Sequence, residues 1–221
     1  VLRLAIRPAP PRPADIEKHS AVRVLFIGSV NHGGEFWSKG GMEVLESYRM
    51  LRKRYGEAVE LNFRCWMPDE MVSRYGSEPG LRRIPGLLPK DGLDRLFFES
   101  DILLFPAHNT PGIAILEGMR FGLPVVAKDI WANREQVEDG VTGFLVPPSP
   151  SVPYYLPGDV PNWSMDSGPF LEHMVRMDER VVADLVGRLS EMVESAPLRT
   201  RMGSEGRRAV EEGRFSIRTR N

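Results

Sequence analysis

Short apolar runs alternate with helix-periodic segments along the middle of the chain, and this alternation constrains the fold more than any other feature. The run at residues 24–27 is continuous and ends at Gly28, as expected for a strand buried on both faces of a parallel sheet. Between residues 42 and 55, apolar side chains recur at spacings of four, three and four, which is the period of a helix. The pattern continues with predicted strands at 59–63, 102–105, 125–127 and 144–146 and predicted helices at 93–97, 113–121 and 133–138.

This alternation, with its short connections, predicts an α/β fold with a doubly wound, parallel, Rossmann-like sheet. In such a sheet, ligands bind beyond the carboxyl ends of the strands. We expect this domain at residues 22–146, continued by helices of the same domain at 180–221, of which the first covers 180–194. Prolines mark the other two segments, which are a linker or extended arm at 1–21 and a Pro-rich excursion without a regular period at 147–179.

The composition excludes several classes of protein. The 29 basic and 30 acidic residues nearly cancel, so no overall field favours nucleic acid as a partner. No apolar tract reaches the length of about 18 residues that a membrane span needs, and we expect a soluble chain. The lone Cys65 excludes an internal disulfide framework and a cysteine-based zinc site, and it suits a reducing compartment. The chain starts at Val1 without a signal-peptide pattern, which suggests a fragment.

Several segments in a fixed order carry a resemblance to a known family. They are residues 26–28, 39–40, 106–127 and 135–146. Within the third segment, Glu117 follows Gly112 by five residues, and a Gly-Leu-Pro turn at 122–124 leads into an apolar strand. Together these segments resemble the donor-site signature of retaining glycosyltransferases of the GT-B fold, similar to glycosyltransferase family 4 (glycosyl transferases group 1). That family includes sucrose synthases, mannosyltransferases and glycogen-synthase relatives.

The resemblance implies an enzyme that transfers a glycosyl group from a nucleoside-diphosphate sugar to an acceptor, with retention of the anomeric configuration. It implies that this chain is the C-terminal, donor-binding half, from which the N-terminal acceptor-binding domain is absent, so we expect the isolated chain to be inactive. We expect no cofactor and no metal ion, because the sequence shows no clustered acidic metal motif. A cytoplasmic location is expected, with peripheral membrane association of the full-length protein as a further option.

The expected site lies where the predicted strand at 102–105 meets the following helix. There the backbone N–H groups of Gly112, Ile113 and Ala114 would face a diphosphate at the positive end of the helix dipole. The resemblance assigns the ribose hydroxyls to Glu117, one turn further along. Lys39, expected at the start of a helix across the crevice, would neutralise charge on the leaving diphosphate. Lys39 and Glu117 are therefore the expected catalytic residues.

Other residues are expected to line the same crevice. Gly28 ends the first strand, and the resemblance places Gly86 and Leu87 along the nucleobase. His32 and His108 both adjoin the predicted crevice, but we interpret histidines in such loops more readily as loop or capping residues than as catalytic groups.

The sequence departs from the family pattern at several positions. Asn109 stands where the family has a carboxylate that contacts the donor sugar, and Ser29 stands where it has an arginine, so two charges are lost. The segment 30–38 is longer than usual, and His32 within it is the candidate for a replacement contact to the diphosphate. Residues 64–66 replace a glycine-rich turn; they supply either a compensating guanidinium or a packing surface for the missing domain.

Two alternatives to the enzyme remain. A non-catalytic nucleotide-sugar-binding or interaction module would be consistent with the neutral Ser29 and Asn109. A nicotinamide-dependent dehydrogenase is disfavoured, because no Gly-x-Gly-x-x-Gly pattern follows the first strand.

Overall fold

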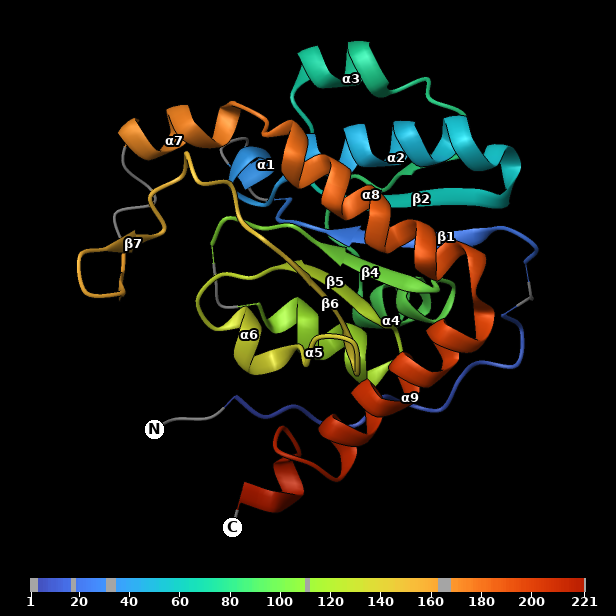
Figure 1. Ribbon diagram of the computed structural model, residues 1–221. Coiled ribbons are helices and arrows are strands. Elements are labelled where there is room, and N and C mark those ends of the chain that lie inside the picture. The colour runs from blue at the N-terminus through green and yellow to red at the C-terminus, as the bar shows by residue number, and fades with distance from the viewer. Residues whose placement is uncertain (1–3, 17–18, 31–34, 110–111, 163–167, 221) are drawn as a thin grey trace.

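The computed structural model describes residues 4–16, 19–30, 35–109, 112–162 and 168–220 (Figure 1). Within these ranges, six parallel strands form one sheet in the order β3-β2-β1-β4-β5-β6. The strands are β1 (Val22–Ile27), β2 (Val59–Arg64), β3 (Leu81–Arg83), β4 (Ile102–Phe105), β5 (Val125–Lys128) and β6 (Gly143–Val146). This architecture confirms the predicted doubly wound, Rossmann-like fold.

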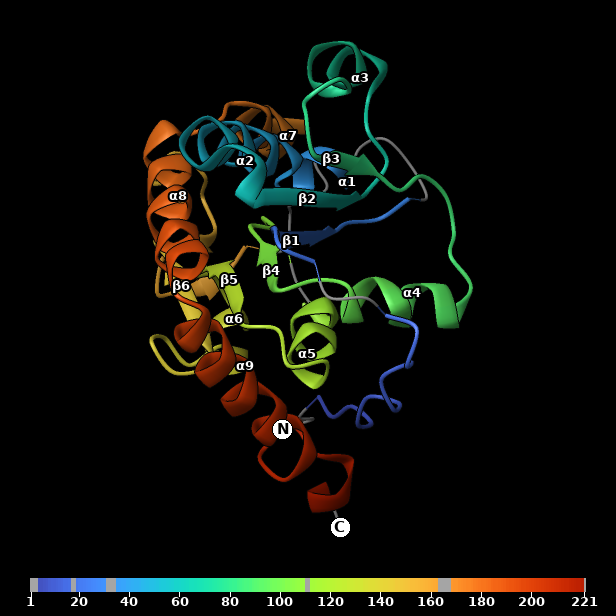
Figure 2. The ribbon, with the colours of Figure 1, turned by 90° about the vertical axis from the view of Figure 1, so that its right-hand side faces the viewer.

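Helices cover both faces of the sheet. Figure 2 shows the sheet between α2 and α8 on one side and α4 and α5 on the other, while α9 packs along α5. The α-helices are α1 (Glu35–Ser38), α2 (Gly41–Tyr55), α3 (Asp69–Tyr75), α4 (Lys90–Phe98), α5 (Ile113–Arg120), α6 (Asn133–Gln136), α7 (Gly168–Val175), α8 (Glu179–Glu194) and α9 (Ala196–Glu211). Two 3-10 turns, η1 (Gly56–Ala58) and η3 (Ile217–Arg220), complete the described helical structure.

The strands bury side chains on both faces, which explains why they read as continuous apolar runs. In β1, Val24 and Phe26 join the core beneath α2 and α8, and Leu25 joins the core above α4 and α5. In β4, Leu104 and Leu103 divide between the two cores in the same way. Alternate side chains of a strand point to opposite faces, so the two helical layers are held by one sheet.

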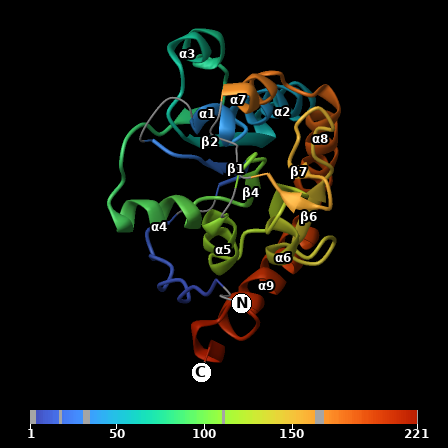
Figure 3. The ribbon, with the colours of Figure 1, turned by 90° about the vertical axis from the view of Figure 1, so that its left-hand side faces the viewer.

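The order of the strands creates a switch point between β1 and β4. The chain leaves β1 for α2 on one face and leaves β4 for α5 on the other. The two connections therefore diverge at the carboxyl edge, which is where ligands of such sheets bind. Figure 3 faces this edge and shows α1, α5, α6 and α7 around it.

Some elements went unpredicted, and the Pro-rich segment contains most of them. Residues expected to lack a regular period form a small antiparallel ribbon of β7 (Tyr155–Leu156) and β8 (Val160–Pro161), followed by α7. Helix α3 was also missed. These elements are short, and the ribbon strands of two residues each are too brief to produce a period.

The amino-terminal segment packs along the domain beside the carboxyl-terminal one. The backbone N–H of Ile6 donates to the carbonyl of Phe215 at 3.1 Å, and Ile16 is buried in the core with α4 and α5. None of the helices in the described ranges combines the length and the apolar character needed to cross a membrane.

Candidate functional site

Lys39 and Asn109 meet at the switch point. The Lys39 ammonium donates to the side-chain oxygen of Asn109 at 2.8 Å, although the two residues are 70 positions apart in the sequence. Lys39 does not begin a helix as expected, because α1 ends at Ser38 and α2 begins at Gly41. It lies in the turn between them, where Gly40 has a φ of 77° and a Cβ would come within 2.5 Å of a backbone carbonyl oxygen. The glycine is thus required for the close approach of the two loops.

The amino terminus of α5 faces the same edge. Gly112 caps this helix without a side chain, and a Cβ there would approach side-chain atoms of Ile115 and Phe105 at 3.0 and 3.2 Å. The first turn of α5 contains no acidic residue, and Ile113 is 51% exposed. The amides of Gly112, Ile113 and Ala114 therefore head a helix whose positive end is not neutralised by its own side chains.

Glu117 lies one turn into α5 and is half-buried. Burial raises the pKa of its carboxyl, while Arg120 and Arg64 act in the opposite direction and Asp94 adds to the rise. This carboxylate is thus partly withdrawn from water and lies near the arginine that ends β2. A group in that environment can accept hydrogen bonds from hydroxyls.

Arg64 brings a second cation to the edge. Its Nη1 atom donates to the carbonyl of Gly28 at 3.3 Å, whereas its buried Nε atom has no hydrogen-bond partner. Burial lowers the pKa of this guanidinium. A buried, unsatisfied guanidinium nitrogen is costly, so Arg64 is a group that a ligand anion would stabilise.

Cys65 packs against the end of β1. Its Sγ atom lies 3.2 Å from the carbonyl of Ser29, and a Cβ on Gly28 would come within 2.4 Å of that sulfur. Burial and the nearby Glu35 raise the pKa of the thiol to about 12, and Lys39 and Arg64 oppose that rise. Gly28 is therefore required for the packing of Cys65.

The remaining expected site residues lie further from Lys39 along the carboxyl edge, at the end of β1, or outside the residues that the structure describes. Gly86, at a φ of 79°, and the 80% exposed Leu87 follow β3 at the same edge, two strands from β1. Ser29 lies at the end of β1, where its carbonyl accepts from the N–H of Trp66 at 2.9 Å. His32 lies outside the described residues, so its expected contact to a diphosphate stays a prediction.

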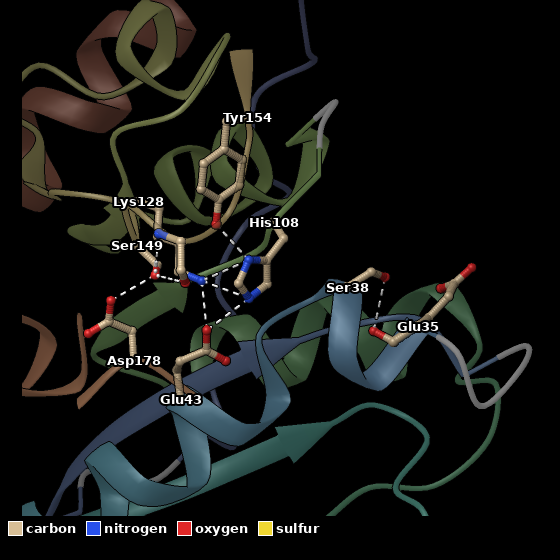
Figure 4. A network of polar contacts seen from close by, with 9 residues as sticks. Glu35, Ser38, Glu43, His108, Lys128, Ser149, Tyr154 and Asp178 are labelled. Atoms are coloured by element: carbon tan, nitrogen blue, oxygen red, sulfur yellow. Dashed lines mark hydrogen bonds and ion pairs between the residues drawn. The ribbon is translucent and has the colours of Figure 1, made fainter. Parts of the chain in front are cut away.

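A buried polar cluster lies directly behind Asn109, and the sequence reasoning missed it (Figure 4). It consists of Glu43, His108, Lys128 and Tyr154, which are 3%, 2%, 0% and 3% exposed. His108 is at its centre, because Nε2 lies 2.8 Å from Glu43 Oε1 and Nδ1 lies 2.6 Å from the Tyr154 hydroxyl. His108 lies in the loop after β4, as expected, but its burial in this cluster was not expected. Lys128, the one charged residue of β5, was the sequence signal that could have indicated a buried polar cluster.

The charges of the cluster balance internally. Lys128 donates to Glu43 Oε1 at 2.8 Å. Burial alone would raise the pKa of the Glu43 carboxyl, but Lys128 and His108 lower it well below its usual range. Burial, together with Lys128, lowers the pKa of His108. Burial also lowers the pKa of the Lys128 ammonium, while the Glu43 carboxylate raises it.

Among the residues that the structure describes, no group of three or more His, Cys, Asp or Glu side chains is arranged to hold a metal ion.

Comparison with known proteins identifies the family of this chain and supports its fold. Residues 21–152, more than half of the chain, match the sequence model of the family described as Glycosyl transferases group 1. The D-inositol 3-phosphate glycosyltransferase of Mycolicibacterium gilvum (strain PYR-GCK) is 35% identical over 82 residues, which cover 36% of this chain and 19% of that protein. The matched part therefore spans about a fifth of the length of this relative.

Two solved structures resemble the whole domain. The C-terminal domain of a glycosyl transferase group 1 family protein, LpcC, from Francisella tularensis is 16% identical with a TM-score of 0.59; the match covers 84% of this chain and 82% of that one. Alr3699/HepE from Anabaena, solved in complex with UDP and glucose, is 16% identical with a TM-score of 0.61; the match covers 90% of this chain and 46% of that one. At these identities the likeness shows a shared Rossmann-like fold.

Proposed function

Because this chain belongs to the glycosyl transferases group 1 family, we propose that it binds the nucleoside-diphosphate sugar of a retaining, metal-independent glycosyltransferase of the GT-B type. One observation carries the proposal. Lys39, Arg64 and the amino terminus of α5 converge on the carboxyl edge at the switch point between β1 and β4. A cluster of positive groups at that position is what a diphosphate requires.

Each group has a place along the donor. The diphosphate binds at the first turn of α5, with Lys39 on one side and Arg64 on the other. Glu117, one turn further along the same helix, accepts hydrogen bonds from the ribose hydroxyls. Gly86 and the exposed Leu87 border the nucleobase at the end of β3.

Catalysis depends chiefly on the leaving group. The acceptor oxygen attacks the anomeric carbon from the face on which the diphosphate departs, so the configuration is retained. The bond from the anomeric carbon to the diphosphate oxygen breaks, and the electron pair goes to the diphosphate. Lys39 and the helix amino terminus stabilise that charge where it develops. Asn109 holds Lys39 through a hydrogen bond from the ammonium to a neutral amide oxygen.

The acceptor site belongs to a second domain in this proposal. Support comes from the match to an isolated C-terminal domain of a group 1 protein and from the 46% coverage of Alr3699/HepE, which was solved with UDP and glucose. In the full-length protein, residues 1–21 would connect to the acceptor-binding domain. The chain alone would bind the donor without transferring its sugar.

A non-catalytic nucleotide-sugar-binding module is the second candidate. The neutral side chains of Ser29 and Asn109 favour it, because both stand where the family has charges. Arg64 favours the enzyme, because it brings a guanidinium to the end of the strand beside Ser29. An assay of the full-length protein for donor hydrolysis and transfer distinguishes the two candidates.

Binding of nucleoside diphosphates to this chain tests the proposal. Calorimetry with UDP, GDP and ADP should show at least one ligand whose affinity falls in Glu117→Gln, since a hydrogen bond to a charged group contributes about 1.5–3 kcal/mol. Glu191→Gln is the matched control; it removes a carboxylate that pairs with Arg188 on the surface of α8. Unchanged affinity in a folded Glu117→Gln protein would contradict the ribose assignment, and binding of none of the three diphosphates would contradict the proposed function.

A further inference from the structure

We propose that Glu43, His108, Lys128 and Tyr154 form a buried positioning cluster that holds Lys39 and Asn109 in place for the donor diphosphate. This inference rests on the proposed function and adds to it a set of residues that do not touch the donor. The four residues come from four separate segments, namely α2, the connection after β4, the end of β5 and the Pro-rich segment before β7.

The cost of the cluster indicates a role other than stability. Its carboxylate and ammonium are almost completely removed from water, and the desolvation of such a pair costs several kcal/mol per ion before their attraction is counted. Apolar side chains of similar volume would serve the core at least as well. A network of directional hydrogen bonds, by contrast, fixes the orientation of the loops that carry it.

The cluster joins the two loops that carry Lys39 and Asn109. Segments 38–43 and 106–109 are connected at three successive points, from the surface inward. The contacts are Lys39 Nζ to Asn109 Oδ1, the His108 N–H to the Ser38 carbonyl and His108 Nε2 to Glu43 Oε1, each at 2.8 Å. Because His108 directly precedes Asn109, a change in the His108 backbone displaces the partner of Lys39.

The contacts of both ring nitrogens hold the histidine ring in position. His108 Nε2 lies 2.8 Å from Glu43 Oε1, which accepts hydrogen bonds, and 2.9 Å from Lys128 Nζ, which donates them. His108 Nδ1 is hydrogen-bonded to the Tyr154 hydroxyl at 2.6 Å, and the two rings are nearly parallel at 9° with centroids 6.0 Å apart. Tyr154 is itself held, because Trp131 Nε1 donates to its carbonyl at 2.8 Å. The Tyr154 hydroxyl therefore connects the Pro-rich segment to His108.

Removal of that hydroxyl is the test. Tyr154→Phe keeps the ring and its packing, and it should weaken binding of the tightest of UDP, GDP and ADP by roughly 3- to 10-fold, the effect of one hydrogen bond. Tyr48→Phe is the matched control, because Tyr48 is also buried and its hydroxyl donates to the Pro79 carbonyl at 2.6 Å, before β3 at the opposite edge. The control should bind like the unaltered chain, and unaltered binding in Tyr154→Phe would overturn the proposal.

A double-mutant cycle separates positioning from a general structural effect. In a Lys39→Met background, Tyr154→Phe should cause no further loss of diphosphate affinity, because the group that it positions is already gone. An equal loss in both backgrounds would show that Tyr154 acts independently of Lys39 and would overturn the proposal.

A measurement without ligand distinguishes this inference from the proposed function. Exchange of the His108 backbone N–H, which donates to the Ser38 carbonyl, should be faster in Tyr154→Phe than in Tyr48→Phe or the unaltered chain. If no diphosphate binds, the proposed function fails while this readout still decides whether the cluster holds the two loops. Equal exchange in all three proteins would overturn the positioning role.

Discussion

Two arginines on neighbouring strands differ in their hydrogen-bond partners, one at the amino edge and one at the carboxyl edge of the sheet. Arg23, near the start of β1, donates through Nε to Glu60 at 2.8 Å, and these two residues are register partners of β1 and β2. Arg64, at the end of β2, donates to one backbone carbonyl and has a buried Nε without a partner. The same pair of strands therefore has a neutralised guanidinium at one end and an unsatisfied one at the other.

The contrast extends to the surrounding groups. At the amino edge, Asp101 accepts from the N–H of Arg23 at 2.8 Å and lies 3.7 Å from His19. At the carboxyl edge, Lys39 is held by a neutral amide, and α5 presents an amino terminus without an acidic first turn. At the first edge the charged side chains pair with one another, whereas the second edge combines Lys39, Arg64 and the amino terminus of α5. Substitutions at the two edges test the functional difference that we propose between them.

The largest effect is expected from Lys39. In the full-length protein, Lys39→Met should lower kcat for glycosyl transfer by roughly 10²- to 10³-fold, the usual cost of losing one preorganised group that stabilises developing negative charge. Arg23→Met, which removes a cation from the amino edge, should leave kcat unchanged. Steady-state kinetics of both variants is the measurement. Equal rates for Lys39→Met and the unaltered enzyme would assign leaving-group stabilisation elsewhere.

A smaller effect is expected from Arg64. Arg64→Gln should weaken binding of a nucleoside diphosphate by about 10- to 100-fold, which corresponds to a charged hydrogen bond of about 1.5–3 kcal/mol, and should leave binding of the nucleoside nearly unchanged. Calorimetry with the diphosphate and the nucleoside measures both. A loss confined to the nucleoside would instead mean that Arg64 acts through Glu117, its electrostatic neighbour.

The matched control again lies at the amino edge. Arg23→Gln should not change diphosphate affinity and should lower the free energy of unfolding by less than about 1 kcal/mol, as expected for a partly exposed ion pair. If Arg23→Gln and Arg64→Gln weakened diphosphate binding equally, the distinction between the two edges would be wrong.

The sequence was sufficient for five of the six strands that the structure describes in the main sheet, and it indicated the turn from β4 into α5. Strands buried on both faces produce continuous apolar runs, and β1, β2, β4, β5 and β6 were found within a residue or two of their observed bounds. Short elements such as α3 and the β7 and β8 ribbon were missed, because they contain too few residues to establish a period. The glycine at the start of α5 was identifiable because a strand and a helix flank it.

The contacts that organise the site could not be predicted in the same way. The pairing of Lys39 with Asn109 and of Glu43 with His108 depends on which loops the sheet brings together, and no periodicity encodes that proximity. Lys128 was a visible signal, because a charged residue at the end of an apolar strand needs a partner. Its partner lies 85 positions away and is defined only by the fold.

The smallest effect is expected from the pH dependence of stability, which compares a histidine at each edge. His108 is buried against Glu43, Lys128 and Tyr154, and burial and Lys128 lower its pKa in the folded state. In the unfolded chain its pKa is about 6.5. Below that pH the unfolded chain therefore binds a proton that the folded chain does not. Stability that is fully present above about pH 6.5 is lost as the pH falls toward the folded pKa.

His108→Gln should remove part of this loss. Between about pH 7.5 and pH 5.5, the free energy of unfolding of the unaltered chain should fall by about 1 kcal/mol more than that of the variant, within the limit of about 1.4 kcal/mol per pH unit that one proton allows. Glu43 contributes little in this window, because its lowered pKa causes loss of stability only as the pH falls through and below the ordinary pKa of a carboxyl group. His19→Gln at the amino edge is the control. The free energy of unfolding of this variant should fall between the two pH values as much as that of the unaltered chain. Denaturant unfolding at both pH values is the measurement, and equal losses in the unaltered chain and in His108→Gln would show that a protonated His108 is accommodated in the core.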